Sequence, residues 1–206
     1  MEWLNNIYYL NKRGVEVKKI SINSPFVLIF TGISLIVLLL GYLTNGITTE
    51  LFFCTYKDSI LNPLMYLRLF THILGHADFE HWIGNMLYFL ILGPILGPML
   101  EEKYGTKNLT IMVLFCSFVN GIINNIVSPN GQYGASGNDL MFILLSSITN
   151  KEEGKIPLTF ILVAILYIGS EVFSCFTNDE ISQMAHIIGG LVGSLFGFIL
   201  NKKNIK

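Results

Sequence analysis

Residues 134–149 read GASGNDLMFILLSSIT, in which a serine between small residues introduces a short apolar helix. The glycines near Ser136 permit a sharp turn and close backbone approach, which a nucleophile needs if a substrate carbonyl is to reach it. A serine at a helix N-terminus also has backbone N–H groups beside it that can stabilise an oxyanion. The same small residues are typical of close packing between membrane helices, so this stretch indicates catalysis only together with partners elsewhere.

The apolar helix after the serine is too short to cross a bilayer. Residues 136–149 give about 21 Å at 1.5 Å per residue, whereas a hydrocarbon core is about 30 Å thick. If the helix ends at the charged segment 151–155 on one surface, Ser136 lies below the opposite surface. The preceding loop must then dip into the membrane, which is tolerated only where protein or water surrounds it. The sequence therefore predicts that water reaches this serine.

The rest of the chain has the composition of an all-α membrane protein. Its 206 residues are 52% hydrophobic and 13% charged, and the apolar residues form runs near membrane length. The three cysteines lack metal-type spacing, and the first apolar run is predicted to be a retained span, not a cleaved signal. We expect six spans, at about residues 25–47, 81–100, 109–127, 136–149, 156–173 and 183–200.

Basic residues predict the orientation of these spans. With six spans both chain ends share one side, which receives every basic residue except Lys57 and Arg68. We therefore expect a multi-pass protein of the cell membrane, with both termini cytoplasmic and its active site opening toward the outer side. The predicted parts are a cytoplasmic N-terminal segment (1–24), a six-helix membrane domain (25–200) and a cytoplasmic tail (201–206).

A long segment, residues 48–80, joins the first two spans and is apolar enough in places to fold onto the bilayer surface. His72 and His76 could lie one turn apart and chelate zinc. However, there is no H-E-x-x-H motif and no suitably placed carboxylate, so we expect neither metal nor cofactor. We interpret both histidines and Arg68 as residues that order this loop, and Glu101 as a cap for chain ends at the cytoplasmic boundary.

A serine hydroxyl needs a base, and His186 is the best candidate. It lies in the outer third of the last span, at a depth comparable with Ser136 if both helices start from the same side. A stripe of small residues can serve helix packing alone, with the histidine there incidental. However, a histidine inside a membrane costs free energy and is commonly functional. The glycines that permit close approach here are Gly189, Gly190 and Gly193, matched by Gly137 beside the serine.

Two further side chains could stabilise an oxyanion. His81 and Asn85 are four residues apart, hence on one face at the outer end of the second span, and both can donate hydrogen bonds. Alternatively, they cap or cross-link helices. Polar side chains that could hold the water needed for hydrolysis are Asn120, Asn124, Asn125 and Gln132.

Together these residues resemble the rhomboid family of intramembrane serine proteases. The matching motifs occur in family order over about residues 25–200. The chain departs from the family pattern after the serine, where Asn138 and Asp139 are polar and Leu140 replaces a usual aromatic. The motifs are Arg68 with His72 and His76, His81-x-x-x-Asn85, Gly97-Pro98-Met99-Leu100-Glu101 with Gly105, Gly134-Ala135-Ser136-Gly137, and Ala185-His186 with its glycines.

The resemblance implies a six-transmembrane-helix bundle with a short fourth helix and a long membrane-associated first loop. It implies a Ser136–His186 dyad without a third acidic residue, and an oxyanion site formed by His81, Asn85 and the Ser136 backbone. Gly134 and Ala135 would lie in the loop that lines the substrate. The expected partners are the lipid bilayer and transmembrane proteins with helix-destabilising segments, and neither nucleic acid nor metal.

Two other functions fit parts of the sequence. A non-catalytic rhomboid-like protein would bind membrane helices for quality control, and a small-solute transporter would use the polar groups of the third and fourth spans. The presence of both Ser136 and His186 favours the protease over the binding protein. The absence of a repeat between the two halves of the sequence disfavours the transporter.

Overall fold

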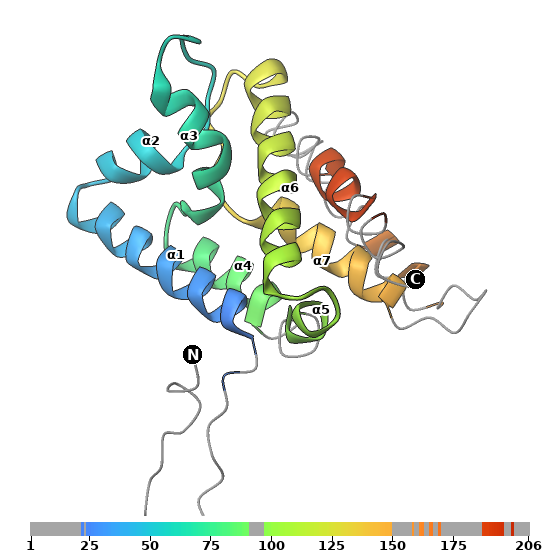
Figure 1. Cartoon of the computed structure of the whole chain (residues 1–206). Helices are drawn as coiled ribbons and strands as arrows, with labels where there is room; N and C mark the ends of the chain where they lie inside the picture. The colour runs from blue at the N-terminus through green and yellow to red at the C-terminus, as the bar shows by residue number, and fades with distance from the viewer. Residues whose placement is uncertain are drawn as a thin grey trace, which may run out of the picture.

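The computed structural model describes residues 22, 24–90, 97–149, 187–195 and, between and beyond these last ranges, residues 158, 161, 162, 165, 166, 169 and 199. Within these residues the chain is α-helical apart from short connections and one isolated β-bridge (Figure 1). The helices are α1 (Pro25–Leu43), α2 (Ile47–Phe53), α3 (Pro63–Thr71), the short 3₁₀ helix η1 (His72–Leu74), α4 (Phe79–Leu90), α5 (Gly97–Tyr104), α6 (Thr106–Val127) and α7 (Ser136–Thr149), and residues 187–195 are also helical.

Two of the described helices, α1 and α6, are long and apolar enough to cross a membrane. The predicted short helix is confirmed, because α7 begins at Ser136 and ends at Thr149. The predicted segments 1–24 and 201–206 and most of the fifth and sixth spans lie outside the described residues.

The predicted end of the first span at Ile47 is wrong. Helix α1 ends at Leu43, Asn45 follows in the left-handed region at φ +51°, and the N–H of Gly46 donates to the carbonyl of Gly41 at 2.8 Å. A left-handed residue after the C-cap, with this bond from the next residue, is a common way to terminate a helix. Ile47 therefore starts α2, although its side chain continues the apolar run of the sequence.

The second span also differs from its predicted range of 81–100. Helix α4 begins at Phe79, and Leu100 belongs to a separate helix, α5, which continues to Tyr104.

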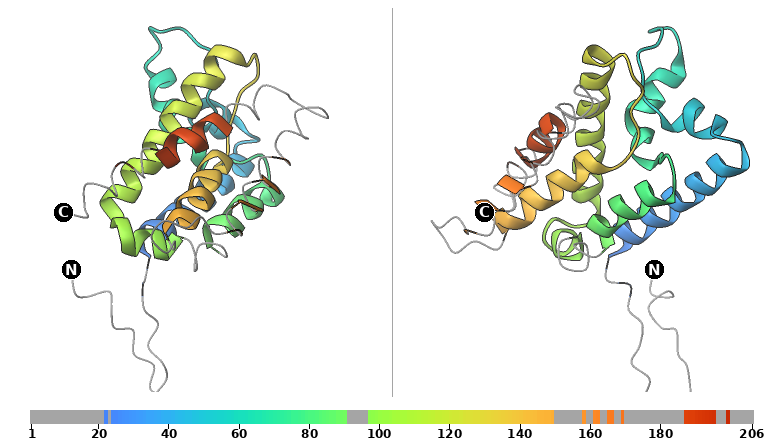
Figure 2. Two further views of the ribbon diagram at one scale, coloured as in Figure 1. Left: turned by 90° about the vertical axis from the view of Figure 1, so that its right-hand side faces the viewer. Right: turned by 180° about the vertical axis from the view of Figure 1, so that it is seen from behind.

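Helix α6 lies at the centre of the fold and contacts α1, α3, α5 and α7 (Figures 1 and 2). Aromatic rings join the helices on one side of it. The ring of Phe89 stacks on Phe30 of α1 at 4.6 Å between centroids and contacts Phe142 of α7 at 4.8 Å. The core therefore holds α4 between α1 and α7, which fixes the position of the serine-bearing helix.

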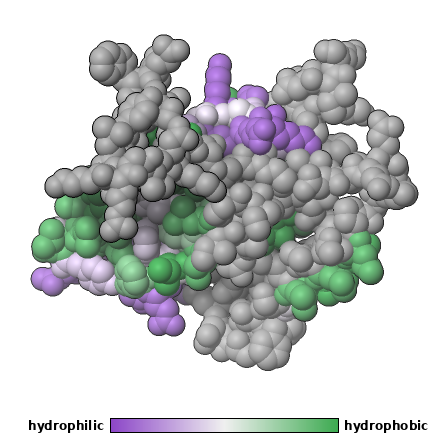
Figure 3. Space-filling model, turned by 90° about the horizontal axis from the view of Figure 1, so that it is seen from below, coloured by the Kyte–Doolittle hydropathy of each residue, from purple (hydrophilic) through white to green (hydrophobic). Residues whose placement is uncertain are grey.

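The outward faces of these helices are apolar. On α1, Ile29, Ile36 and Leu43 are at least half exposed, as expected for side chains that meet lipid. The view from below shows apolar surface at the margins of the molecule (Figure 3). Exposed apolar side chains of this kind are expected on helices that face lipid.

The long first loop is largely folded into α2, α3 and η1, and Arg68 joins its parts. The Arg68 side chain is only 1% exposed. It donates hydrogen bonds to the carbonyl of Leu51 and the hydroxyl of Tyr56, and it forms an ion pair with Asp58. Because these partners come from separate stretches of the loop, the arginine ties the loop into one unit.

Glu101 connects the start of α1 to the corner between α5 and α6. Its carboxylate accepts hydrogen bonds from the backbone N–H of Phe26 (2.9 Å) and the hydroxyls of Ser24 and Thr106 (both 2.6 Å). The carboxylate thus caps a helix whose first N–H groups have no partner within the helix.

We expect Glu101→Ala to lower the free energy of unfolding by about 2–3 kcal/mol, since buried donors would lose a charged acceptor. Thermal unfolding in detergent micelles measures this change. Glu102→Ala is the matched control, because the neighbouring Glu102 side chain is exposed. Equal unfolding midpoints for the two variants would contradict the capping role.

Candidate active site

The segment that leads into α7 is held by the first loop on two sides. Thr55 and Gln132 exchange backbone hydrogen bonds of 2.9 and 2.8 Å, which form the isolated β-bridge. Two residues further on, the N–H of Gly134 donates to the carbonyl of His72 at 3.0 Å. The position of Ser136 is therefore fixed by residues about 60–80 positions earlier in the chain.

Gly134 lies directly against His81 and Asn85. Its φ is +114°, which side chains rarely adopt. A Cβ at this position would lie 2.8 Å from His81 Nε2 and 3.2 Å from Asn85 Oδ1. The glycine therefore permits both the turn and the close approach of the two side chains to the loop.

Asn85 is held by two hydrogen bonds to its carbonyl oxygen. Asn85 Oδ1 accepts from the Ala135 N–H at 2.7 Å and lies 3.1 Å from His76 Nε2. Both nitrogens of the His76 ring face oxygen atoms, since Nδ1 lies 3.2 Å from the Leu74 carbonyl, and we assign the proton of the neutral ring to Nε2, which makes the shorter contact. The Nδ2 of Asn85 is then the end that can donate to a substrate atom.

His81 presents its Nε2 toward the same loop. Its Nδ1 accepts a long hydrogen bond from the Ala77 N–H at 3.5 Å, which assigns the ring proton to Nε2. The ring lies 5.1 Å from that of His76 and 6.0 Å from that of Tyr133, between centroids. His81 Nε2 and the amide group of Asn85, whose Oδ1 bonds the Ala135 N–H, thus lie beside the residue pair that precedes the serine.

Ser136 is the first residue of α7. The N–H groups of Asn138 and Asp139 donate to the carbonyl of Ala135 at 2.8 and 3.0 Å, so Ala135 precedes the first turn. A helix N-terminus carries a partial positive charge, which favours negative charge beside its first turn. The geometry therefore combines a serine hydroxyl with donors from a helix N-terminus and two side chains.

The helical segment 187–195 packs closely on α6 and α7 (Figure 2). A Cβ on Gly190 would lie 2.7 Å from Leu140, and one on Gly193 2.7 Å from Met141 Sδ. Leu140, which stands where the family has an aromatic, is completely buried. His186 itself lies outside the described residues, so its distance to Ser136 is not defined.

Buried amides surround the Thr55–Gln132 bridge. Thr55 Oγ1 donates to Asn125 Oδ1 at 3.1 Å, and Asn124 Nδ2 donates to the carbonyl of Asn130 at 3.1 Å. Among the described residues, Asn124 Oδ1, Asn125 Nδ2 and both amide atoms of Gln132 are buried without a hydrogen-bond partner. Such groups are typical binding sites for internal water.

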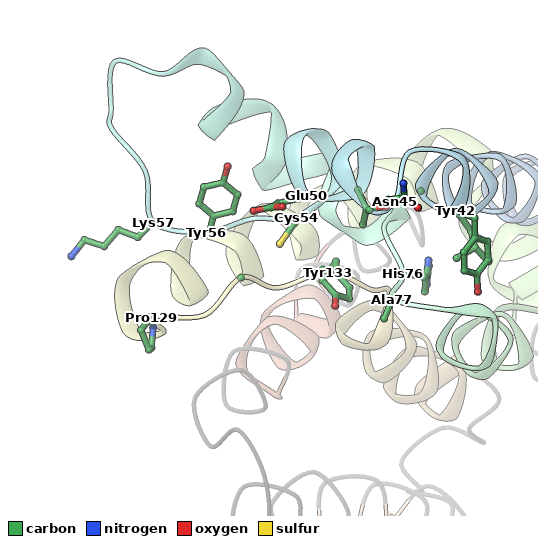
Figure 4. Close-up of a pocket in the computed structure, with 15 residues that line it drawn as sticks. Tyr42, Asn45, Glu50, Cys54, Tyr56, Lys57, His76, Ala77, Pro129 and Tyr133 are labelled. Carbon is green, nitrogen blue, oxygen red and sulfur yellow. The ribbon is translucent and has the colours of Figure 1, made fainter.

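A cavity of 760 Å³ lies next to His76 (Figure 4). His76, Ala77 and Tyr133 form the part of its wall that is nearest the site. The His76 ring thus contributes to the cavity wall and also bonds Asn85. The residues that line the rest of the cavity include Tyr42, Asn45, Glu50, Cys54, Tyr56 and Lys57.

The described residues contain no group of three or more histidines, cysteines or carboxylates that could hold a metal ion. His72 Nδ1 instead bonds the carbonyl of Arg68 at 3.0 Å, and His76 joins Asn85. The contact between His76 and Asn85 was not predicted from the sequence. Nine positions separate them across a loop and a helix start, and this separation matches no helical or strand period.

Burial lowers the pKa of His72 to about 4, and burial followed by the charge of His81 lowers the pKa of His76 to about 4. Between the ordinary value of 6.5 and about 4, the unfolded chain binds protons that the folded chain does not bind. The free energy of unfolding therefore keeps its full value above about pH 6.5 and decreases as the pH falls toward 4. We expect thermal unfolding midpoints to show this decrease and His76→Gln to reduce it. Parallel pH curves for wild type and variant would contradict the assignment.

A family model described as the rhomboid domain matches residues 63–203, more than half of the chain. This chain belongs to the rhomboid family. The result confirms the resemblance inferred from the sequence, and it establishes a multi-span helical membrane fold.

Two individual rhomboid proteins illustrate how distant the similarity of these relatives is. This chain is 28% identical over 138 residues to "Rhomboid protease GlpG" of Haemophilus influenzae, and the matched region covers 66% of this chain and 70% of that protein. It is 27% identical over 142 residues to "RHOMBOID-like protein 1" of Arabidopsis thaliana, which covers 64% of this chain and 34% of the plant protein. The chain is thus a rhomboid membrane protein with distant relatives named as proteases.

Proposed function

We propose that this rhomboid protein is an intramembrane serine endopeptidase that cleaves membrane-protein substrates within or near their transmembrane helices. The observation that carries the proposal is the convergence of His81 and Asn85 on Gly134 and Ala135, directly before Ser136 at the start of α7. Helix packing alone does not require two polar side chains at this point. Acyl transfer at a serine uses hydrogen-bond donors there, which His81 Nε2 and Asn85 Nδ2 can supply.

In the proposed mechanism His186 removes the proton from Ser136 Oγ, which attacks the scissile carbonyl. The negative charge that develops on the carbonyl oxygen is stabilised by Asn85 Nδ2, His81 Nε2 and backbone N–H groups of the first turn of α7. His186 then gives its proton to the leaving amine, and an acyl-enzyme forms. Water, activated by His186, hydrolyses the acyl-enzyme and restores Ser136.

We propose that the buried amides around the Thr55–Gln132 bridge supply this water. Their unpartnered atoms lie on the segment that leads to the serine and on α6. A water molecule there would have several polar partners, which a stable internal site needs. Access to water would thus come from inside the protein and not from the lipid.

The proposed topology has six spans, of which α1, α4, α6 and α7 would be the first four. Both termini would be cytoplasmic, with the membrane domain over 25–200 between the segments 1–24 and 201–206. Its support is the excess of basic residues on the side of the termini, together with the short α7. Ser136 would then lie below the outer surface of the cell membrane.

This depth determines which substrates can be cut. The backbone of an intact transmembrane helix is hydrogen-bonded within the helix, and hydrocarbon disfavours breaking those bonds. We expect cleavage of a model transmembrane substrate in proteoliposomes to decrease when leucine replaces its helix-breaking residues in the outer turn, and to recover when one glycine or proline is restored. Each replacement of this kind changes helix propensity by about 1–3 kcal/mol.

Mass spectrometry of the products should place the cut near the outer boundary of the substrate helix. The matched control substrate carries the same leucine replacements at its cytoplasmic end, where they should have no effect. Cleavage at the cytoplasmic end, or equal rates for all substrates, would contradict the depth argument. Tight binding of every substrate without cleavage would instead support a non-catalytic rhomboid-like protein.

A further inference from the structure

Asn120 of α6 lies between the helix that carries the serine and the helical segment that follows His186. Its side chain is 2% exposed. A Cβ added to Gly137 of α7 would overlap Asn120 Nδ2, and one added to Gly189 would overlap Asn120 Oδ1. The amide therefore fills the space that side chains on these two glycines would take.

The two glycines are close in sequence to the proposed catalytic pair. Gly137 directly follows Ser136, and Gly189 is three positions after His186. One turn earlier on α6, Cys116 donates from its thiol to the carbonyls of Gly137 (3.5 Å) and Gly189 (3.2 Å). Cys116 and Asn120, on successive turns of α6, thus contact the same two residues, Gly137 and Gly189.

The polarity of Asn120 is not explained by its described neighbours. Its Nδ2 has only a weak contact of 4.0 Å with Cys116 Sγ, and its Oδ1 is buried without a partner among the described residues. What the structure shows is instead a close steric fit between a flat side chain and two residues that lack side chains. Packed interiors are sensitive to changes of even one methylene at such a contact.

We propose that Asn120 is a positioning residue that sets the separation between α7 and the 187–195 helix, and through it the approach of His186 to Ser136. This inference rests on the proposed function, because it concerns the geometry of the Ser136–His186 dyad. It adds a residue outside the sequence motifs that carry the resemblance to the family. A dyad has no third residue to orient its histidine, so the spacing of the two helices must do so.

The expected result for Asn120→Ala is a decrease in kcat of about 10- to 100-fold with little change in KM, because misplacement of reacting groups slows chemistry more than binding. The labelling rate of Ser136 by a fluorophosphonate should fall in parallel. Asn120→Leu, which has a similar shape and no polar atoms, should retain most of the wild-type rate. Wild-type kcat in a well-folded Asn120→Ala variant would overturn the proposal.

A double-mutant cycle provides the sharper test. Gly189→Ala should lose activity because its methyl group overlaps Asn120, and the combination with Asn120→Ala should recover activity relative to Gly189→Ala alone. Gly193→Ala is the matched control, since a Cβ there would meet Met141 and Cys116 but not Asn120. Asn120→Ala should therefore not rescue it. Rescue of both glycine variants, or of neither, would overturn the proposal.

Failure of the inference can be separated from failure of the proposed function. If wild type shows no labelling or cleavage that depends on Ser136, the protease function itself is wrong. If Ser136-dependent labelling is present and Asn120→Ala leaves its rate unchanged, only the positioning role is wrong. Thermal unfolding of each variant shows whether a lost activity reflects chemistry or loss of the fold.

Discussion

Ser136→Ala is expected to abolish proteolysis, with a decrease in kcat of about 10⁴-fold or more, while the protein remains folded. The substitution removes only the hydroxyl oxygen at the first position of α7. The hydrogen bonds from Asn138 and Asp139 to the Ala135 carbonyl involve backbone atoms, so the helix start should persist. Cleavage of a transmembrane substrate and covalent labelling by a fluorophosphonate measure the effect.

The matched control for the nucleophile is Ser117→Ala. Ser117 lies on α6, is buried, and donates to the carbonyl of Val113 at 2.7 Å. Its hydroxyl also accepts a hydrogen bond from Asn138 Nδ2 of α7 at 3.3 Å, so this variant removes a buried hydroxyl next to the start of α7 while Ser136 itself stays in place. Labelling should persist in this variant and vanish in Ser136→Ala. Persistent cleavage by folded Ser136→Ala protein would refute the proposed mechanism.

Asn85→Ala should lower kcat by about 10²–10³-fold, the usual effect of removing one oxyanion donor. The structure shows why the donor is well placed, since the Ala135 N–H and His76 hold Oδ1 and orient Nδ2 away from them. Removal of the side chain also leaves these two donors without their acceptor. The free energy of unfolding of this variant should therefore decrease together with its kcat.

Asn85→Asp separates the two effects. A carboxylate keeps an oxygen for Ala135 and His76 but offers no donor, and its charge opposes a developing oxyanion. We expect a fold as stable as that of Asn85→Ala or more stable, with turnover at least as low. Asn108→Ala is the control, because Asn108 lies in the first turn of α6, far along the helix from the loop before Ser136, and donates to the Tyr104 carbonyl at 2.8 Å. Wild-type kcat in Asn85→Asp would show that the pair only cross-links helices.

The sequence alone predicted α7 and its short length, because small residues followed by a continuous apolar run define a helix start without help from distant contacts. It also predicted the all-α membrane class and the family, since composition and the order of the motifs are properties of the chain itself. It failed at the end of α1, where an apolar residue continued the pattern but the left-handed turn at Asn45 and Gly46 terminated the helix. Local turn chemistry overrode hydrophobic periodicity there.

The tertiary structure decided which polar groups meet. Glu101 bonds the N–H of Phe26, 75 residues earlier, His76 holds Asn85 from a different element, and Asn120 fits between glycines of two helices. No residue period predicts such contacts, because they depend on how helices cross and on where loops return. The sequence thus determined which helices form and which residues can carry chemistry. The packing of those helices around α6 determined how the side chains are oriented and spaced.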